Sequence, residues 1–324
     1  MMNIGLPIAI VLGAALAAPA AVHAQKYPAK TIRLVLPFAT GSAVDVLARL
    51  YAQKMSEAWG QQVLVDNRTG ASGIVGMEFI ARAAPDGYTL GMGNVATLAI
   101  NPSLYAKLPY DVARDFVPIL YAAAIRNSLE VHPSLPVHSV KALVALARAR
   151  PGELNYASGG VGSAQHIPME MLKAMTGINI VHISYKGLTP AFNDVLAGQV
   201  PMMVSGVVTA LPHHKTGRLR IIATTGATRT QVTPEIPTIA EAGVPGYEFD
   251  SWTGFLAPTG TPPAIVAQVQ AEAARISKLP DIRERLTAAG FEVVGGSSEA
   301  FETLIRSNHA RLGKVIRDAG IKAE

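Results

Sequence analysis

Two glycine-containing loops, each placed between an apolar strand and an amphipathic helix, constrain the fold of this chain more than any other feature. The first loop, residues 38–45, follows the apolar run 31–37, and the second, residues 158–166, follows the strand-like run 154–157. The first amides of each following helix have no intrahelical acceptor, so each helix start carries about half a positive charge and accepts an anion. The two loops therefore predict a clamp that closes on a small acidic molecule.

Strand-like and helical runs alternate along almost the whole chain, which is typical of sheets covered by helices on both faces. Because the strand–loop–helix pattern begins again near residue 125, we expect an α/β protein of two domains, each with a mostly parallel sheet. From residue 262 onward we expect only helices, packed on the first domain. The expected boundaries are 25–124 plus 246–324 for the first domain and 125–245 for the second, with a hinge near 122–128 and 225–250.

The first 25 residues contain no Asp, Glu, Lys or Arg, and the apolar stretch 4–22 ends in a small-x-small pattern at Ala24. This arrangement predicts a signal peptide over 1–24 that is cleaved after Ala24, and hence a periplasmic protein. The alternative is a membrane anchor. Two prolines and a glycine interrupt a run already short of the ~20 residues that a span requires, so we favour export.

Charge and cysteine content exclude several classes of function. The chain has no cysteine, which excludes disulfides, thiolate metal sites and cysteine nucleophiles. Its 28 Lys+Arg against 23 Asp+Glu are dispersed and do not alternate with aromatic residues, so we expect no nucleic-acid partner. His213 and His214 are neighbours that diverge by about 100° on a helix, which favours a surface pair over a metal site. We expect a monomer without cofactor or metal.

A series of short motifs resembles the periplasmic solute-binding proteins of tripartite tricarboxylate transporters, also called Bug proteins. The resemblance covers nearly the whole chain after the leader. It implies a two-domain, periplasmic-binding-protein-like (Venus flytrap) fold, a small organic carboxylate as ligand and integral-membrane transporter subunits as partners. The motifs, in chain order, are Pro-Phe-Ala-x-Gly-x-x-x-Asp at 37–45, Asn-Arg-x-Gly-Ala-x-Gly at 67–73, Ala-Pro-Asp-Gly-Tyr-Thr-Leu at 84–90, Gly-Ser-Ala-Gln-His at 162–166, Gly-Gln-Val at 198–200 and Pro-Thr-Ile-Ala-Glu-Ala-Gly at 237–243.

The resemblance implies that the two loops hold the carboxylate between them. Backbone amides and the hydroxyls of Ser42 and Ser163 can donate to a carboxylate without a buried cation, each bond contributing roughly 1.5–3 kcal/mol. We expect Asn94 and Thr97 to line the cleft as well. The ligand residues expected in the loops are Phe38, Thr40, Gly41, Ser42 and Ala43 on one side and Gly162, Ser163, Ala164, Gln165 and His166 on the other.

Three departures from the family pattern suggest the kind of ligand. The first loop reads Thr-Gly-Ser at 40–42 where the family has Pro-Gly-Gly, and Leu98 stands where the family often has His. Pro201 and Ser205 stand at positions that are commonly Asp, so we expect Ser205 at a less polar far end of the cleft. These departures favour a dicarboxylate or an aromatic carboxylate over an amino acid, whose ammonium group would lack a counter-charge.

Two other functions remain as alternatives. Ser163 and His166 suggest a small-molecule hydrolase, but no Gly-x-Ser-x-Gly elbow surrounds any serine, so we expect no enzyme. A sensory adaptor for a receptor kinase would share the binding site and differ only in its partner. Asp45 is expected to favour the helix dipole rather than to bind ligand, and His166 is equally compatible with a ligand contact or a cap.

Overall fold

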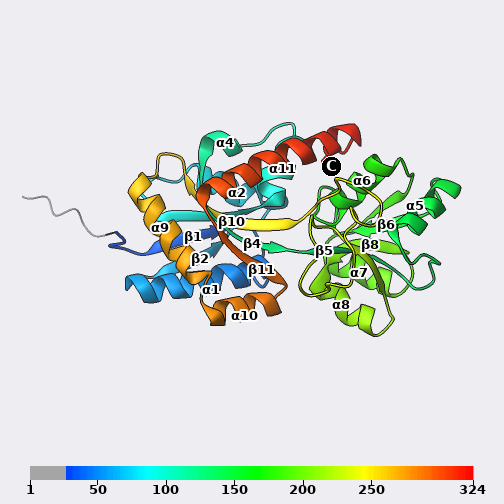
Figure 1. The fold of residues 1–324 in the computed structure, drawn as a ribbon. Coiled ribbons are helices and arrows are strands. Elements are labelled where there is room, and N and C mark those ends of the chain that lie inside the picture. The colour runs from blue at the N-terminus through cyan, green and yellow to red at the C-terminus, as the bar shows by residue number, and fades with distance from the viewer. Residues whose placement is uncertain (1–26, 324) are drawn as a thin grey trace, which may run out of the picture.

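The structure is a computed structural model that describes residues 27–323. The chain forms two lobes, each built on its own β-sheet and lying side by side (Figure 1). We call the lobe around the six-stranded sheet the first lobe and the lobe around the five-stranded sheet the second lobe. The expected signal peptide, residues 1–24, lies outside the described residues.

The first lobe combines both ends of the described chain. Its sheet has the strand order β11-β4-β10-β3-β1-β2. The strands are β1 (Ile32–Leu36), β2 (Val63–Asn67), β3 (Thr89–Asn94), β4 (Phe116–Ile125), β10 (Ser251–Pro258) and β11 (Phe291–Gly296). The helices and helical turns are α1 (Ala43–Trp59), η1 (Ala71–Gly73), α2 (Ile74–Ala81), η2 (Ala96–Ile100), α3 (Asn101–Leu104), α4 (Val112–Asp115), α9 (Pro263–Ile276), α10 (Pro280–Ala288) and α11 (Ser298–Asp318).

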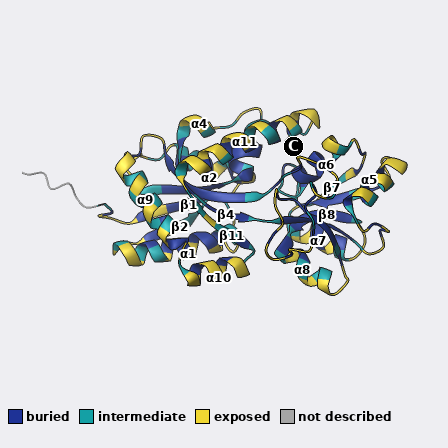
Figure 2. Cartoon of the chain, in the orientation of Figure 1, coloured by how far each residue is buried: buried dark blue, intermediate teal, exposed yellow. Residues whose placement is uncertain are grey.

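The second lobe is continuous in sequence, and its sheet has the order β7-β6-β8-β5-β9. The strands are β5 (Asn127–Val131), β6 (Asn155–Ser158), β7 (Val181–Ser184), β8 (Met202–Gly206) and β9 (Arg220–Thr224). The helices are α5 (Val140–Ala149), α6 (His166–Thr176), α7 (Leu188–Leu196) and α8 (Val207–Lys215). Buried strands lie beneath helices with exposed outer faces in both lobes (Figure 2).

The α/β class with two sheets is confirmed, but the sheets are mixed rather than mostly parallel. β1 pairs in parallel with β2 and β3, whereas β10 is antiparallel to β3 and β4. The cause is the chain path, since β4 leads directly into the second lobe and the later strand β10 returns in the opposite direction. The expectation of helices alone after residue 262 is wrong at β11, which pairs antiparallel with β4 at the sheet edge.

Local sequence explains why α1 begins and ends where it does. The Ser42 side chain accepts a hydrogen bond from the Asp45 amide, which caps the helix start. Gly60 ends the helix with φ +64°, a left-handed conformation that favours glycine. Between these caps, Leu47, Tyr51 and other residues at helical spacing are buried against the sheet.

Ion pairs and hydrogen bonds join the two chain segments that cross between the lobes. Arg126, between β4 and β5, pairs with Asp250, which lies just before β10, and with Glu292 of β11. The Thr225 amide donates to the Asn127 carbonyl at 2.9 Å, and Asn127 Nδ2 donates to Ser251 Oγ at 3.1 Å, so the two crossings lie side by side.

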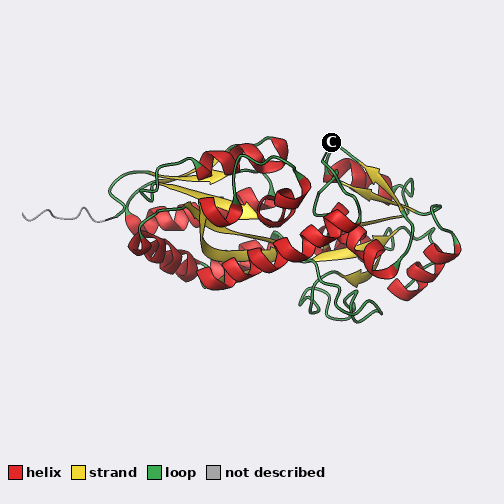
Figure 3. Ribbon diagram, turned by 90° about the horizontal axis from the view of Figure 1, so that it is seen from above, coloured by secondary structure: helices red, strands yellow, loops and turns green. Residues whose placement is uncertain are grey.

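Helix α11 connects the lobes a second time. It packs on β4 and η2 of the first lobe and reaches α6 of the second lobe (Figure 3). Leu312 and Ile316 of α11 belong to one hydrophobic cluster with Met169 of α6. The lobes therefore share a continuous apolar core on the side of α11. Within residues 27–323, none of the helices has both the length and the hydropathy needed to cross a bilayer.

Candidate functional site

A cavity of about 290 Å³ lies between the two lobes, at the crossings. It is bounded by residues of β3, α1 and the α10–β11 link from the first lobe and by the starts of several helices from the second lobe. The lining residues are Ala43, Asn94, Val95, Ala96, Ile125, Asn127, Ala164, Gln165, Leu188, Gly206, Val208, Thr209, Ser251, Ala289 and Gly290.

The N-terminal ends of four helices meet at this cavity. Ala43 is the first residue of α1, Gln165 precedes α6, Leu188 begins α7, and Gly206 precedes α8. Strand order explains the convergence, because β6, β7 and β8 run parallel and their carboxyl ends lie at one edge of the sheet, where each following helix begins. Four helix starts around one cavity create a positive potential that favours an anion.

The first loop is held in shape by Asp45. Its Oδ2 accepts hydrogen bonds from the Gly41 amide at 3.0 Å and Arg49 Nε at 2.9 Å, and its Oδ1 accepts from Asn67 Nδ2 at 2.9 Å. Burial alone would raise the pKa of Asp45, but these hydrogen bonds lower it on balance. Asp45 therefore organises the loop, while the Ser42 hydroxyl, which accepts from the Asp45 amide at 3.2 Å, keeps its own proton to donate.

The second loop is held in shape by His166. Its Nδ1 accepts a hydrogen bond from the Gly162 amide at 3.1 Å, and its ring stacks on His182 with ring centroids 4.0 Å apart. Burial is the main cause that lowers the pKa of His166 to about 3, so the ring is neutral at neutral pH. His166 is buried behind the loop and is not part of the cavity wall.

Asn94 lines the cavity, and Thr97 fixes its side chain. The backbone amide of Asn94 donates to Thr97 Oγ1 at 3.0 Å, and the backbone amide of Thr97 donates to the side-chain oxygen Asn94 Oδ1 at 3.1 Å. With Oδ1 occupied, the Asn94 Nδ2 group remains to donate to a guest. Thr97 itself is fully buried, and its role is to position Asn94.

Of the residues expected at the site, four belong to the cavity wall: Ala43, Asn94, Ala164 and Gln165. The others lie in the same loops or behind them. Those outside the wall are Phe38, Thr40, Gly41 and Ser42 in the first loop, Gly162, Ser163 and His166 in the second loop, Thr97 after β3, and Ser205 in β8.

The structure changes the interpretation of the sequence departures. Leu98 is fully buried and borders a different pocket, so it does not alter the cleft wall. Ser205 is also fully buried, one residue before the wall residue Gly206. Pro201 precedes β8 at its opposite end, about 17 Å from the cavity end at the usual strand rise. These positions therefore give no information on the polarity of the cavity.

The wall contains amides, hydroxyls and apolar groups but no charged side chain. An anion in this cavity would meet only dipoles, and a cationic group would meet no carboxylate. Among residues 27–323, no three His, Cys, Asp or Glu side chains gather into a set that could hold a metal ion.

Ser163 and His166 do not form a nucleophile–base pair. The Ser163 hydroxyl accepts from the His166 backbone amide at 3.2 Å, while the His166 ring is engaged with Gly162. A serine nucleophile needs a basic side chain within hydrogen-bond reach, and a histidine with such a low pKa is a poor base. The geometry therefore favours a structural role for both residues.

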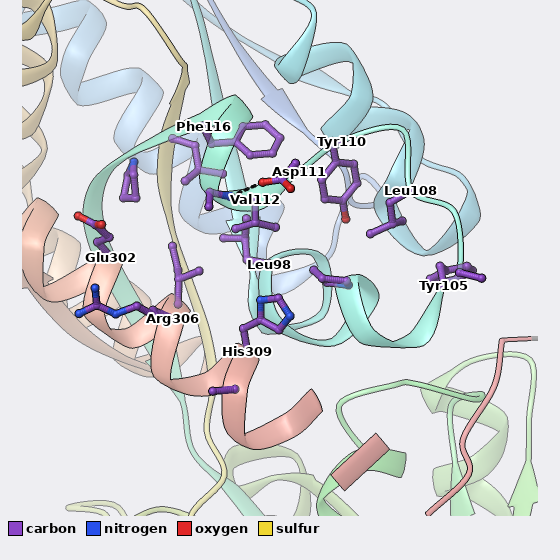
Figure 4. A pocket seen from close by; sticks show the side chains of 17 residues that line it. Leu98, Tyr105, Leu108, Tyr110, Asp111, Val112, Phe116, Glu302, Arg306 and His309 are labelled. Atoms are coloured by element: carbon purple, nitrogen blue, oxygen red, sulfur yellow. Dashed lines mark hydrogen bonds between the residues drawn. The ribbon is translucent and has the colours of Figure 1, made fainter. Parts of the chain in front are cut away.

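A larger pocket of about 700 Å³ lies outside the cleft, on the first lobe between α11 and the segment around α4 (Figure 4). Arg306 and His309 of α11 face Tyr110 and Leu108 across it. Both charge signs occur on its rim, since Glu302 and Asp111 also border it. None of the residues expected to bind ligand borders this pocket.

Comparison with known proteins agrees with this geometry. The family described as the tripartite tricarboxylate transporter family receptor matches residues 47–321. A UPF0065 protein from the tcbD–tcbE intergenic region of Pseudomonas sp. strain P51 is 37% identical over 92% of this chain and 88% of its own length. Two solved structures from Rhodopseudomonas palustris are similar to this chain. Rpa4515 with adipate has 38% sequence identity and a TM-score of 0.79, and the match covers 91% of this chain and 99% of that one. MatC with bound malate has 30% identity and a TM-score of 0.76, and the match covers 90% of this chain and 100% of that one. The chain belongs to the tripartite tricarboxylate transporter receptor (TctC) family of solute-binding proteins, which includes the Bug proteins.

Proposed function

We propose that this protein captures a small organic carboxylate in the cavity between its lobes and delivers it to a tripartite tricarboxylate-type transporter. It does so in the periplasm, after export and cleavage of its signal peptide behind Ala24. One observation carries the proposal: four helix starts surround a cavity whose wall has no charged side chain. Adipate and malate, found with two of the similar structures, are both dicarboxylates and support the same ligand class.

The expected loop residues then divide into two groups. The first group donates hydrogen bonds to the carboxylate. It consists of the backbone amides at the starts of α1 (Ala43) and α6 (near Gln165) and of the hydroxyls of Ser42 and Ser163. The side chains behind the loops hold these amides in place. A few charge-assisted bonds of roughly 1.5–3 kcal/mol each, less the cost of ordering, reach the roughly 8 kcal/mol of micromolar binding.

Capture occurs by movement of the lobes about the crossings near 122–128 and 225–250. We propose these crossings as the hinge between a first domain (25–124 plus 246–324) and a second domain (125–245). A ligand that bonds to both lobes stabilises the closed arrangement because only that arrangement supplies both sets of donors.

The test is calorimetry with a panel of organic acids and their neutral methyl esters. We expect at least one acid to bind in the micromolar range and its ester not to bind. Ala164→Asp, which places a negative charge at the start of α6, should lower affinity at least a hundredfold, whereas the uncharged, equally sized Ala164→Asn should lower it less than tenfold. Equal losses in the two variants, or binding of the ester, would contradict the proposal.

The transporter partnership is tested in cells. Deletion of the gene should abolish uptake of the bound acid even when the transporter subunits are expressed from an independent promoter. If uptake then persists and only induction of transport genes is lost, the partner is a sensor instead.

A further inference from the structure

The side chain of Val208 meets Gly290 across the cleft. Val208 is the second residue of α8 in the second lobe, and Gly290 links α10 to β11 in the first lobe. A Cβ placed on Gly290 would lie 3.3 Å from Val208 Cβ and 3.4 Å from its Cγ2. Gly290 also has φ +90°, a conformation that favours glycine, so the backbone itself forms this surface. The two lobes therefore touch here.

Val208 and Gly290 border two cavities at once. On one side is the 290 Å³ cavity proposed for the carboxylate. On the other side is a second cavity of about 200 Å³, which both residues also line. The contact between them is thus the partition between the two spaces.

The second cavity differs from the first in its chemistry. Its wall includes three charged side chains, Arg126, Arg283 and Glu292, whereas the first cavity has none. Arg126 and Glu292 already pair with each other, with Arg126 Nε 2.7 Å from the Glu292 carboxylate. Arg283 is exposed, and its guanidinium makes a long hydrogen bond, 3.5 Å from Nη1 to the Ser277 carbonyl. A second anionic group that passed the partition would meet Arg283.

We propose that Val208, seated against Gly290, is the end wall of the carboxylate cavity and limits the length of the acid that the protein binds. The inference rests on the proposed function. At about 290 Å³ the cavity lies at the small end of ligand pockets, which usually measure roughly 300–1,000 Å³, so it suits a short acid. A valine in a helix has one strongly preferred rotamer, so this wall is stiff and a longer acid has to force the lobes apart.

The test is calorimetry with linear α,ω-dicarboxylates of four to ten carbons. Wild type should bind the shorter acids and show a drop of at least tenfold in affinity beyond a sharp length. Val208→Ala opens the partition, so the longest acids should gain at least tenfold while the shortest change less than threefold. The longer side chain of Val208→Leu reaches further into the cavity, so the variant should lose affinity already for shorter acids than wild type does. Adding Arg283→Ala to Val208→Ala should remove the gain for diacids.

Leu211→Ala is the matched control. Leu211 lies almost one turn further along α8 and borders only the outer groove between α8 and α10, not the two cavities that share the partition. It should leave the length profile unchanged, and melting curves should confirm that all variants fold. If short acids bind but Val208→Ala and Val208→Leu change all lengths by one common factor, the inference is overturned while the proposed function stands. If no acid binds wild type, both are overturned.

Discussion

The neutral, buried His166 makes a specific prediction about stability and pH. In the folded protein its pKa is about 3, mainly because the ring is buried, whereas an unfolded histidine has a pKa near 6.5. The unfolded state therefore binds one proton more than the folded state between these values. Stability should be intact above pH 6.5 and fall progressively as the pH drops toward 3. At pH 5 the loss amounts to about 2 kcal/mol, from 1.36 kcal/mol for each of the 1.5 pH units below 6.5.

The assay compares wild type with His166→Asn, in which the Asn Oδ1 replaces Nδ1 as acceptor for the Gly162 amide but does not titrate. Free energies of unfolding come from urea denaturation at pH 7.5 and pH 5.0. Wild type should lose about 2 kcal/mol more than the variant between the two pH values. His138→Asn, at an exposed histidine, is the control and should behave like wild type. Equal losses in wild type and His166→Asn would refute the reasoning.

Two further predictions concern groups that hold the loops and the crossings. Asp45→Asn keeps the shape of the side chain but removes the charge of the carboxylate that accepts hydrogen bonds from the Gly41 amide and Arg49. In urea denaturation the variant should be less stable by about 1–2 kcal/mol. An unchanged unfolding midpoint would contradict the role of Asp45 in organising the loop. Arg126→Met leaves Asp250 and Glu292 without their guanidinium and should cost about 2–3 kcal/mol at pH 8. The cost should be smaller at pH 5, because burial raises the pKa of Asp250 to about 6 and its protonated form needs no cation; a larger cost at pH 5 would contradict this account.

Periodicity predicted most elements because their sequences carry local signals. The apolar run 31–37 contains β1, and the strand-like run 154–157 overlaps β6. The strand β11 was not predicted because its six residues end in two glycines between helices, and only pairing with β4, more than 160 residues earlier, makes it a strand. Parallel or antiparallel pairing likewise depends on the path between lobes, which no local window contains.

The site was predictable to the extent that helix starts have a sequence signature. The loops before α1 and α6 combine glycine with serine ahead of an apolar helix, and both contribute to the cavity. Leu188 and Thr209, at the starts of α7 and α8, were missed, although Gly187 and Gly206 stand directly before these helices. Gly290 was missed because its partner Val208 is 82 residues away in the sequence. The His166 ring stacks on Tyr156 and His182, which lie on the neighbouring strands β6 and β7 and meet it only when the sheet forms.

The apolar layer that α11 shares with α6 means that neither half of the molecule is complete alone. Removal of residues 298–323 would take away Leu312 and Ile316. It would expose apolar side chains of both lobes that α11 now covers. Fragments that carry a single sheet should therefore aggregate when produced separately, and the intact chain should melt in one cooperative transition rather than lobe by lobe.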